Sequence, residues 1–198
     1  MSDAPCRRTS WLGDSTLGLI VTSVTLATVS CVQEEAADPV PAFRITAPTE
    51  DIMRYMIDPS ADAIWDALVT EVTTEGVFTT VPETEEDWIE LRRHAVILVE
   101  SPNLLLMDGR RVAAVGSRSE LPGVDLEPEE IEALLAEDSE SWKRLVGELQ
   151  ETGIDVLDAV DRQDVDALLE AGNQLDIACE NCHVQYWYPS LAAPAATP

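Results

Sequence analysis

Near its end the chain carries Cys179-Glu180-Asn181-Cys182-His183, inside a helix-compatible segment that covers residues 164–186. On an α-helix the two cysteines and the histidine stand at positions i, i+3 and i+4, so their side chains leave the same face. The pattern C-x-x-C-H is the attachment signal for a c-type haem: each thiol bonds one haem vinyl group, and the imidazole becomes the proximal iron ligand. The stretch therefore predicts one covalent haem c, with Cys179 and Cys182 as its thioether anchors and His183 as an iron ligand.

Two other chemistries use a C-x-x-C pair. A redox motif of the thioredoxin type is expected near a βαβ pattern, with its first thiol at the start of a helix, whereas this pair follows a long helical segment. A structural zinc site needs four ligands, but the chain holds no second C-x-x-C pair and only one other histidine, His94. Helical periodicity places His94 largely on the polar side of its helix, which predicts a surface residue rather than an iron ligand.

Apolar residues recur at helical spacing in four segments. These segments cover residues 50–72, 85–101, 127–160 and 164–188, and no strand pattern of any length lies between them. Glu127-Pro128 begins either a short helix of its own or the lead-in to the third helix. Pro59 interrupts the first segment, so we expect that helix to be kinked or restarted there. Four amphipathic helices predict an all-α chain folded as an antiparallel four-helix bundle, and the core of such a bundle is a common place for a cofactor.

Local signals refine these helices. Thr49 and Thr84 are predicted N-caps, because each precedes acidic residues in the first turn. Gly153 is expected to bend the third helix, and Gly172 to let a neighbour or the porphyrin approach the fourth closely. Residues 103–123 are the least regular part of the chain after the N-terminal region and are expected to form a long crossing connection.

The first residues, 1–30, predict an export signal. Arg7-Arg8 forms a short basic region, and residues 16–29 form an uncharged stretch that is short for a membrane-spanning helix. Cys31 stands where a lipoprotein signal has its lipidated cysteine; simple cleavage and an uncleaved anchor are the alternatives. Export would place the protein in the periplasm.

Three further ranges complete the organisation. Residues 31–48 read as an acidic, proline-containing tether that would hold the domain off a membrane. Residues 49–188 form the predicted domain, and 189–198 a loose tail. The chain has 38 acidic against 12 basic residues, a net charge of −26, which argues against nucleic acid and anionic lipid and suits a basic partner protein.

A haem motif in the last of four helices resembles the cytochrome c′ family over residues 49–188. The sharp part of the resemblance is Cys179-x-x-Cys182-His183-x-x-Tyr186, and the softer part is Asp51–Trp65, which is similar to the opening of an exported subgroup with the same fold. The resemblance implies a haem in the core of the bundle and, from many family members, a homodimer through the first two helices.

In that family the residue that faces the iron from the first helix divides the members. An apolar residue leaves the iron five-coordinate and open to NO or CO, whereas a methionine fills the site and raises the potential, as in electron carriers. Met53 and Met56 are the two candidates; the resemblance favours Met53, which stands six residues before Pro59. Two alternatives remain. Met56 is the iron ligand, or both methionines only pack in the core and the distal site is open.

Haem carboxylates usually form ion pairs with arginine or lysine. Arg54, beside Met53, is the favoured propionate contact, and Arg110 and Arg111 are further candidates. Family members often carry a basic residue just after the H-x-x-Tyr segment, where this chain has Trp187 and Tyr188.

Three functions therefore stand as hypotheses. The first is an exported monohaem c-type cytochrome that carries single electrons to a redox partner protein, and is not an enzyme. The second is a five-coordinate haem protein that binds small gases. The third is a structural role in which the acidic surface docks a basic partner.

Overall fold

The computed structural model describes residues 43–189, which belong to one compact unit of the chain. The predicted export signal, Cys31, all but the last six residues of the predicted tether, and nearly all of the tail lie outside the described residues. Residues 43–48 have no regular secondary structure. Within residues 43–189 no helix is long and apolar enough to cross a membrane.

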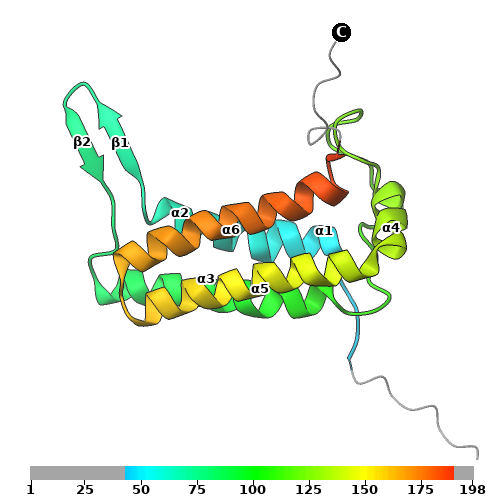
Figure 1. Ribbon diagram of the computed structural model, residues 1–198, viewed down its shortest axis with the longest axis horizontal. Helices are drawn as coiled ribbons and strands as arrows, with labels where there is room; N and C mark the ends of the chain where they lie inside the picture. Colours follow the sequence, from blue (N-terminus) through cyan, green and yellow to red (C-terminus); the bar gives the residue numbers. More distant parts are fainter. Residues whose placement is uncertain (1–42, 190–198) are drawn as a thin grey trace, which may run out of the picture. The chain divides into compact units, whose positions relative to one another are not determined.

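The described unit is mostly helical, in agreement with an all-α chain, and has one small two-stranded sheet (Figure 1). Its elements are α1 (Thr49–Ile52), a π-helix η1 (Met53–Ile57), α2 (Asp58–Asp66), β1 (Thr70–Thr73), β2 (Gly76–Thr79), α3 (Glu85–Leu105), α4 (Pro128–Glu137), α5 (Ser139–Asp161) and α6 (Val165–Tyr186). The segment α1–η1–α2 is continuous and contains a π-helical turn just before Pro59, where the sequence predicts a kink or a restart.

Helix α5 packs against α3 and α6, and α2 contacts both α3 and α6. The short helix α4 lies across one end, against α5 and α6 (Figure 1). The apolar stripes of the helices meet in one core, whose fully buried side chains include Ile64, Leu98, Val156, Leu168 and Leu175. The predicted stripes of the second, third and fourth segments are therefore confirmed as the source of the core.

The prediction that no strand occurs was wrong. The first helix ends at Asp66, and Val72, which the sequence assigns to its apolar stripe, lies in β1 of an antiparallel hairpin where it pairs with Val77. The hairpin is rich in threonine and valine, whose branched Cβ atoms favour strands, and Gly76 adopts a φ of +145° at its turn. All residues of both strands are exposed, and among the described elements the strands pack only against each other.

One of the two predicted N-caps is confirmed. The Thr84 hydroxyl accepts a hydrogen bond from the Asp87 amide, and the Asp87 carboxylate accepts one from the Thr84 amide at 2.9 Å. Thr49 is instead the first helical residue, after Pro48. It needs no side-chain cap, because the amides of Thr49 and Glu50 donate to the backbone oxygens of Arg111 and Val112, at 2.9 and 2.8 Å.

The two helical glycines allow close approach. Trp65 Nε1 donates to the backbone oxygen of Gly172 at 3.0 Å, which confirms that a neighbour approaches this position. At Gly153 a Cβ atom would lie 3.1 Å from both the carbonyl carbon and the oxygen of Leu98, while α5 continues as one α-helix through this residue. The structure thus makes Gly153 the contact point of two backbones.

Replacing Gly153 with alanine is expected to lower the free energy of unfolding by about 1–3 kcal/mol, because the new methyl group would lie 3.1 Å from backbone atoms of α3, closer than ordinary van der Waals contact, so the two helices must move apart slightly. Gly147→Ala is the matched control: it lies in the same helix, a Cβ there meets nothing within 4 Å, and it should stabilise by about 0.5–1 kcal/mol. Urea denaturation of both variants measures the difference. Equal effects would contradict the close approach.

Candidate functional site

A cavity of about 440 Å³ lies between the first helical segment, α4, α5 and α6. Most of its lining is apolar, including Ile57, Ala61, Trp65, Leu105, Val112, Ala113, Leu126, Ile131, Leu135, Trp142, Leu145, Val146, Leu149, Ala178 and Trp187. Its volume is in the range of small-molecule and cofactor sites. The cavity therefore offers a water-poor place in the fold for a large apolar ligand.

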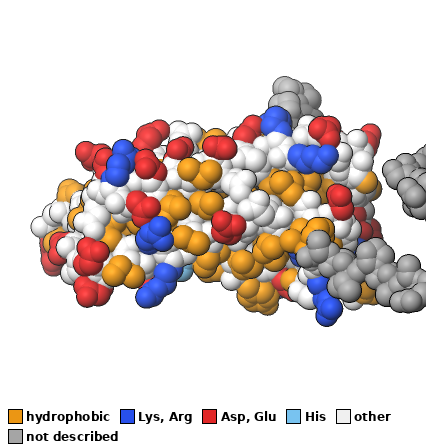
Figure 2. Space-filling view, turned by 90° about the horizontal axis from the view of Figure 1, so that it is seen from below, with side chains coloured by type: hydrophobic (Ala, Val, Ile, Leu, Met, Phe, Trp, Pro, Cys, Tyr) orange, Lys and Arg blue, Asp and Glu red, His pale blue; other side chains and the backbone are white. Residues whose placement is uncertain are grey.

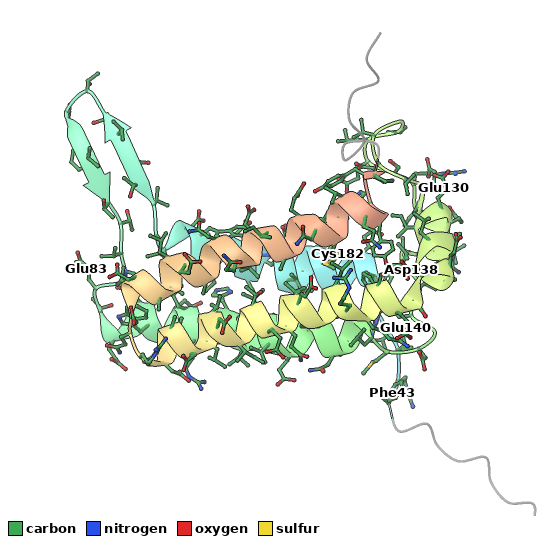
Figure 3. The ribbon with its side chains drawn as sticks, viewed as in Figure 1. Phe43, Glu83, Glu130, Asp138, Glu140 and Cys182 are labelled. Carbon is green, nitrogen blue, oxygen red and sulfur yellow. The ribbon has the colours of Figure 1, made fainter. Side chains whose placement is uncertain are left out.

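The residues of the C-x-x-C-H motif come together on the α6 wall of this cavity. Cys179, Cys182 and His183 all line it, and all three are half-buried. Figure 3 draws the Cys182 side chain on the side of α6 that faces α5. The sequence expectation that one helical face presents all three side chains is met by the geometry.

Both thiols are held in their neutral form. Burial raises the pKa of Cys179 to about 11, with added repulsion from Asp176, and burial raises the pKa of Cys182 to about 12. Both cysteines are free thiols in the structure. In the folded chain the two free thiols are therefore poor nucleophiles near neutral pH.

Alkylation of the haem-free chain should report this burial. At pH 8 we expect iodoacetamide to react with Cys179 and Cys182 about a hundredfold or more slowly than with an exposed cysteine, because the thiolate fraction falls tenfold per pKa unit. Both pKa values lie above the ordinary value of 9.0, so the unfolded chain releases its thiol protons first. The free energy of unfolding should therefore be insensitive to these thiols below pH 9 and should fall as the pH rises from 9 towards 11 and 12.

The urea-unfolded chain serves as the control and should react at the ordinary rate. Mass spectrometry separates the two cysteines by their peptides. Ordinary reactivity in the folded chain would show that the thiols are not buried.

His183 is half-buried and lies beside two aromatic rings. Burial lowers the pKa of its imidazole, partly opposed by Glu180 and Asp58. The rings of Trp187 and Tyr188 approach the imidazole edge-on, at centroid distances of 5.1 and 5.9 Å. A neutral imidazole keeps a lone pair on one ring nitrogen, which is what a metal ligand requires.

The structure separates the two candidate methionines. Met53 lines the cavity that holds the C-x-x-C-H residues, whereas Met56 does not. Both are half-buried and pack against the hydrophobic core. Of the two thioethers, Met53 alone thus shares a cavity with His183.

Of the three arginines that the sequence nominates, one lies at the cavity. Arg54 lines it and pairs with Glu50 at 3.1 Å and with Glu120. Arg110 donates to the backbone oxygens of Leu104 and Ala47, and Arg111 pairs with Glu132 at 2.5 Å; neither lines the cavity.

Sequence reasoning missed the part of the site that the irregular connection supplies. Arg118, Ser119 and Glu120 come from this connection and line the cavity beside Arg54. The connection is tied to the end of α6, because the Leu126 amide donates to the Trp187 oxygen at 2.8 Å. A loop has no periodicity, so its side chains carry no sequence signal for this position.

His94 lies apart from the cavity. Its imidazole is half-buried rather than on the open surface, with Nδ1 3.3 Å from the Ser60 hydroxyl and Nε2 3.5 Å from Glu90. The surface prediction holds in part: α2 packs over this part of α3 and covers much of the ring, but 24% of the side chain stays exposed. The histidine belongs to the α2–α3 contact.

Three comparisons were made with known proteins. No family model, no curated protein and no solved structure matches this chain.

The residues at the cavity suit a haem. One wall presents two thiols and a neutral imidazole, Met53 belongs to another wall, and Arg54 and Arg118 supply cations beside them. Within residues 43–189 no group of three or more His, Cys, Asp or Glu side chains could hold a bare metal ion. A haem brings four nitrogen ligands of its own, so it would need from the protein only one or two further donors, and His183 and Met53 would supply them.

Proposed function

We propose that this chain is an exported monohaem c-type cytochrome of the four-helix-bundle class that carries single electrons. The observation that carries the proposal is the meeting of Cys179, Cys182, His183 and Met53 at one apolar cavity. The segment α1–α2 together with α3, α5 and α6 would form the four helices around the haem. Such a grouping would resemble the arrangement expected for the cytochrome c′ family, in which the last helix carries the haem motif.

In this proposal each residue has a defined task. Cys179 and Cys182 would hold the haem through their sulfur atoms, and His183 and Met53 would supply the protein ligands of its iron. The bound haem iron supplies the one-electron chemistry, and the protein tunes it through ligand identity and polarity. Arg54 supplies a cation for a haem carboxylate.

The cavity walls exclude water and add negative charge. Trp65 and Trp142 contribute large apolar surfaces, while Asp58, Asp176 and Glu180 line the same cavity. These carboxylates would favour the more positive, ferric state of a haem iron bound in the cavity, because opposite charges attract. The apolar walls and the methionine act in the other direction, since they favour the ferrous state.

The partner in this proposal is a basic redox protein outside the cytoplasm. Acidic side chains are scattered over the face shown in Figure 2, with apolar side chains between them. The net charge of −26 favours encounter with a positively charged protein and disfavours anionic surfaces.

The absorption spectrum of the reduced full-length protein, with and without CO, tests the function. We expect covalent haem, a low-spin spectrum and no change with CO, because His183 and Met53 occupy both axial positions. A high-spin spectrum that changes with CO would overturn electron carriage through a six-coordinate iron and favour the gas-binding function. A protein without covalent haem would overturn both.

A further inference from the structure

The helix that carries Met53 contains one turn that is wider than an α-turn. Between α1 and α2 the residues Met53–Ile57 form a π-helix, and the Asp58 amide donates to the Met53 oxygen, five residues back. A π-turn accommodates one extra residue in a helix and is frequent at functional sites. Here it coincides with the only part of the first helical segment that contains methionine.

The residue after Asp58 explains why the turn widens. Pro59 has no amide hydrogen, so the oxygen of Tyr55, four residues back, lacks the donor that an α-helix would provide. The proline ring also collides with that oxygen in a regular α-helix. The wider turn relieves the collision and lets the helix continue on both sides.

Two adjacent rows of side chains on the first helical segment line the cavity, and the shorter one is Glu50, Arg54 and Asp58. The longer row is Thr49, Met53, Ile57, Ala61 and Trp65, at intervals of four, and the π-turn keeps it on the cavity. In an α-helix each interval of four turns the side chain by about 40°, so this row would drift by about 160° from its first to its last member. The extra residue in the π-turn offsets about 100° of this rotation, so the row drifts by only about 60°.

We propose that Pro59, through the π-turn, is the positioning residue that makes Met53 face the haem site. If the residues before α2 continued it as a regular α-helix, the Arg54 side chain would point in the direction in which the Met53 side chain points now. Met53 would move to the direction of Ile52, which is buried at 5% exposure in the core. The width of this one turn then decides which residue of the first helical segment faces the haem iron. That residue can change without any substitution at Met53.

This inference rests on the proposed function only in taking the haem iron as the group that Met53 meets. Its test is the full-length holoprotein with Pro59→Ala. We expect the α-register to form, the Met53 methyl signal in ¹³C-methionine NMR of the reduced protein to lose its ring-current shift, and CO to bind with about tenfold or greater gain in apparent affinity. A Met53 signal that stays shifted in Pro59→Ala would overturn the inference.

Deleting Tyr55 in the Pro59→Ala background should restore the site. Tyr55 lies within the π-turn with 68% of its surface exposed, so its removal takes out the extra residue without removing a core contact. Met53 should then face the haem again, now on a regular α-helix, with its ring-current shift recovered and CO excluded. Failure of this rescue would mean that Pro59→Ala damages the fold rather than the register, and would also overturn the inference.

The matched control is Tyr55→Ala with Pro59 retained. It removes the same side chain but keeps the residue count, so the Met53 shift and the response to CO should match the parent protein. The two failures remain distinguishable. If the parent protein itself binds CO, the proposed axial ligation fails, whereas the ring-current shift of Met53 still reports whether Pro59 makes it face the haem.

Discussion

Alanine at both Cys179 and Cys182 is expected to abolish covalent haem. The two thiols are the only groups on the α6 wall of the cavity that can form thioether bonds to the haem vinyl groups, so the double variant leaves His183 as the sole attachment on that wall. Haem staining after denaturing electrophoresis measures the covalent link directly. We expect the stain to disappear from the double variant and to persist, at reduced yield, in each single variant.

Asn181→Ala is the matched control for these variants. It lies between the two cysteines on the exposed side of α6, so it should leave the stain unchanged. Circular dichroism of the stain-negative chain checks that the helices still form. Retained stain in the double variant would refute the haem motif, and with it the proposed function.

Met53→Ala is expected to convert a closed haem site into an open one. The covalent link through α6 remains, but the distal position loses its thioether, so the spectrum should become high-spin and respond to CO. The reduction potential should fall, because a methionine opposite histidine raises it. Absorption spectroscopy with CO and potentiometric titration of the holoprotein measure both effects.

Met56→Ala separates ligation from packing. This residue is half-buried against the core but does not line the cavity, so its loss should cost about 1–2 kcal/mol of stability and leave the spectrum unchanged. If Met56→Ala opens the site and Met53→Ala does not, Met56 is the ligand. If neither does, the iron has no methionine ligand and the gas-binding function gains support.

The ends and apolar stripes of helices were predictable from the sequence where they depend on residues close together in the chain. The hydrogen bonds of the Thr84 cap join residues three apart, and the apolar stripe of α6 follows from the helical repeat. The hairpin was missed because Val72 fits a helical stripe and a strand equally well when only its spacing is considered. Its threonine-rich, β-branched neighbours were the signal that favours the strand.

Other features depend on residues far apart in the chain and had no local signal. Gly153 matters because its backbone meets Leu98 of another helix, and the Arg54–Glu120 ion pair joins the first helix to the irregular connection. Such contacts exist only after the helices have packed. For the same reason the cavity lining from the connection, including Arg118, lay beyond sequence reasoning.

The sequence by itself determined the chemistry that α6 can present, because two cysteines and a histidine at i, i+3 and i+4 share a helical face whatever surrounds them. It also placed Met53 and Met56 on one helix, three residues apart, and only the family resemblance favoured Met53. Only the tertiary structure put Met53 at the cavity and Met56 away from it. The physical reason is the π-turn before Pro59, which sets the side of the helix from which Met53 projects. That side becomes the cavity side only when α2 is packed against α3 and α6.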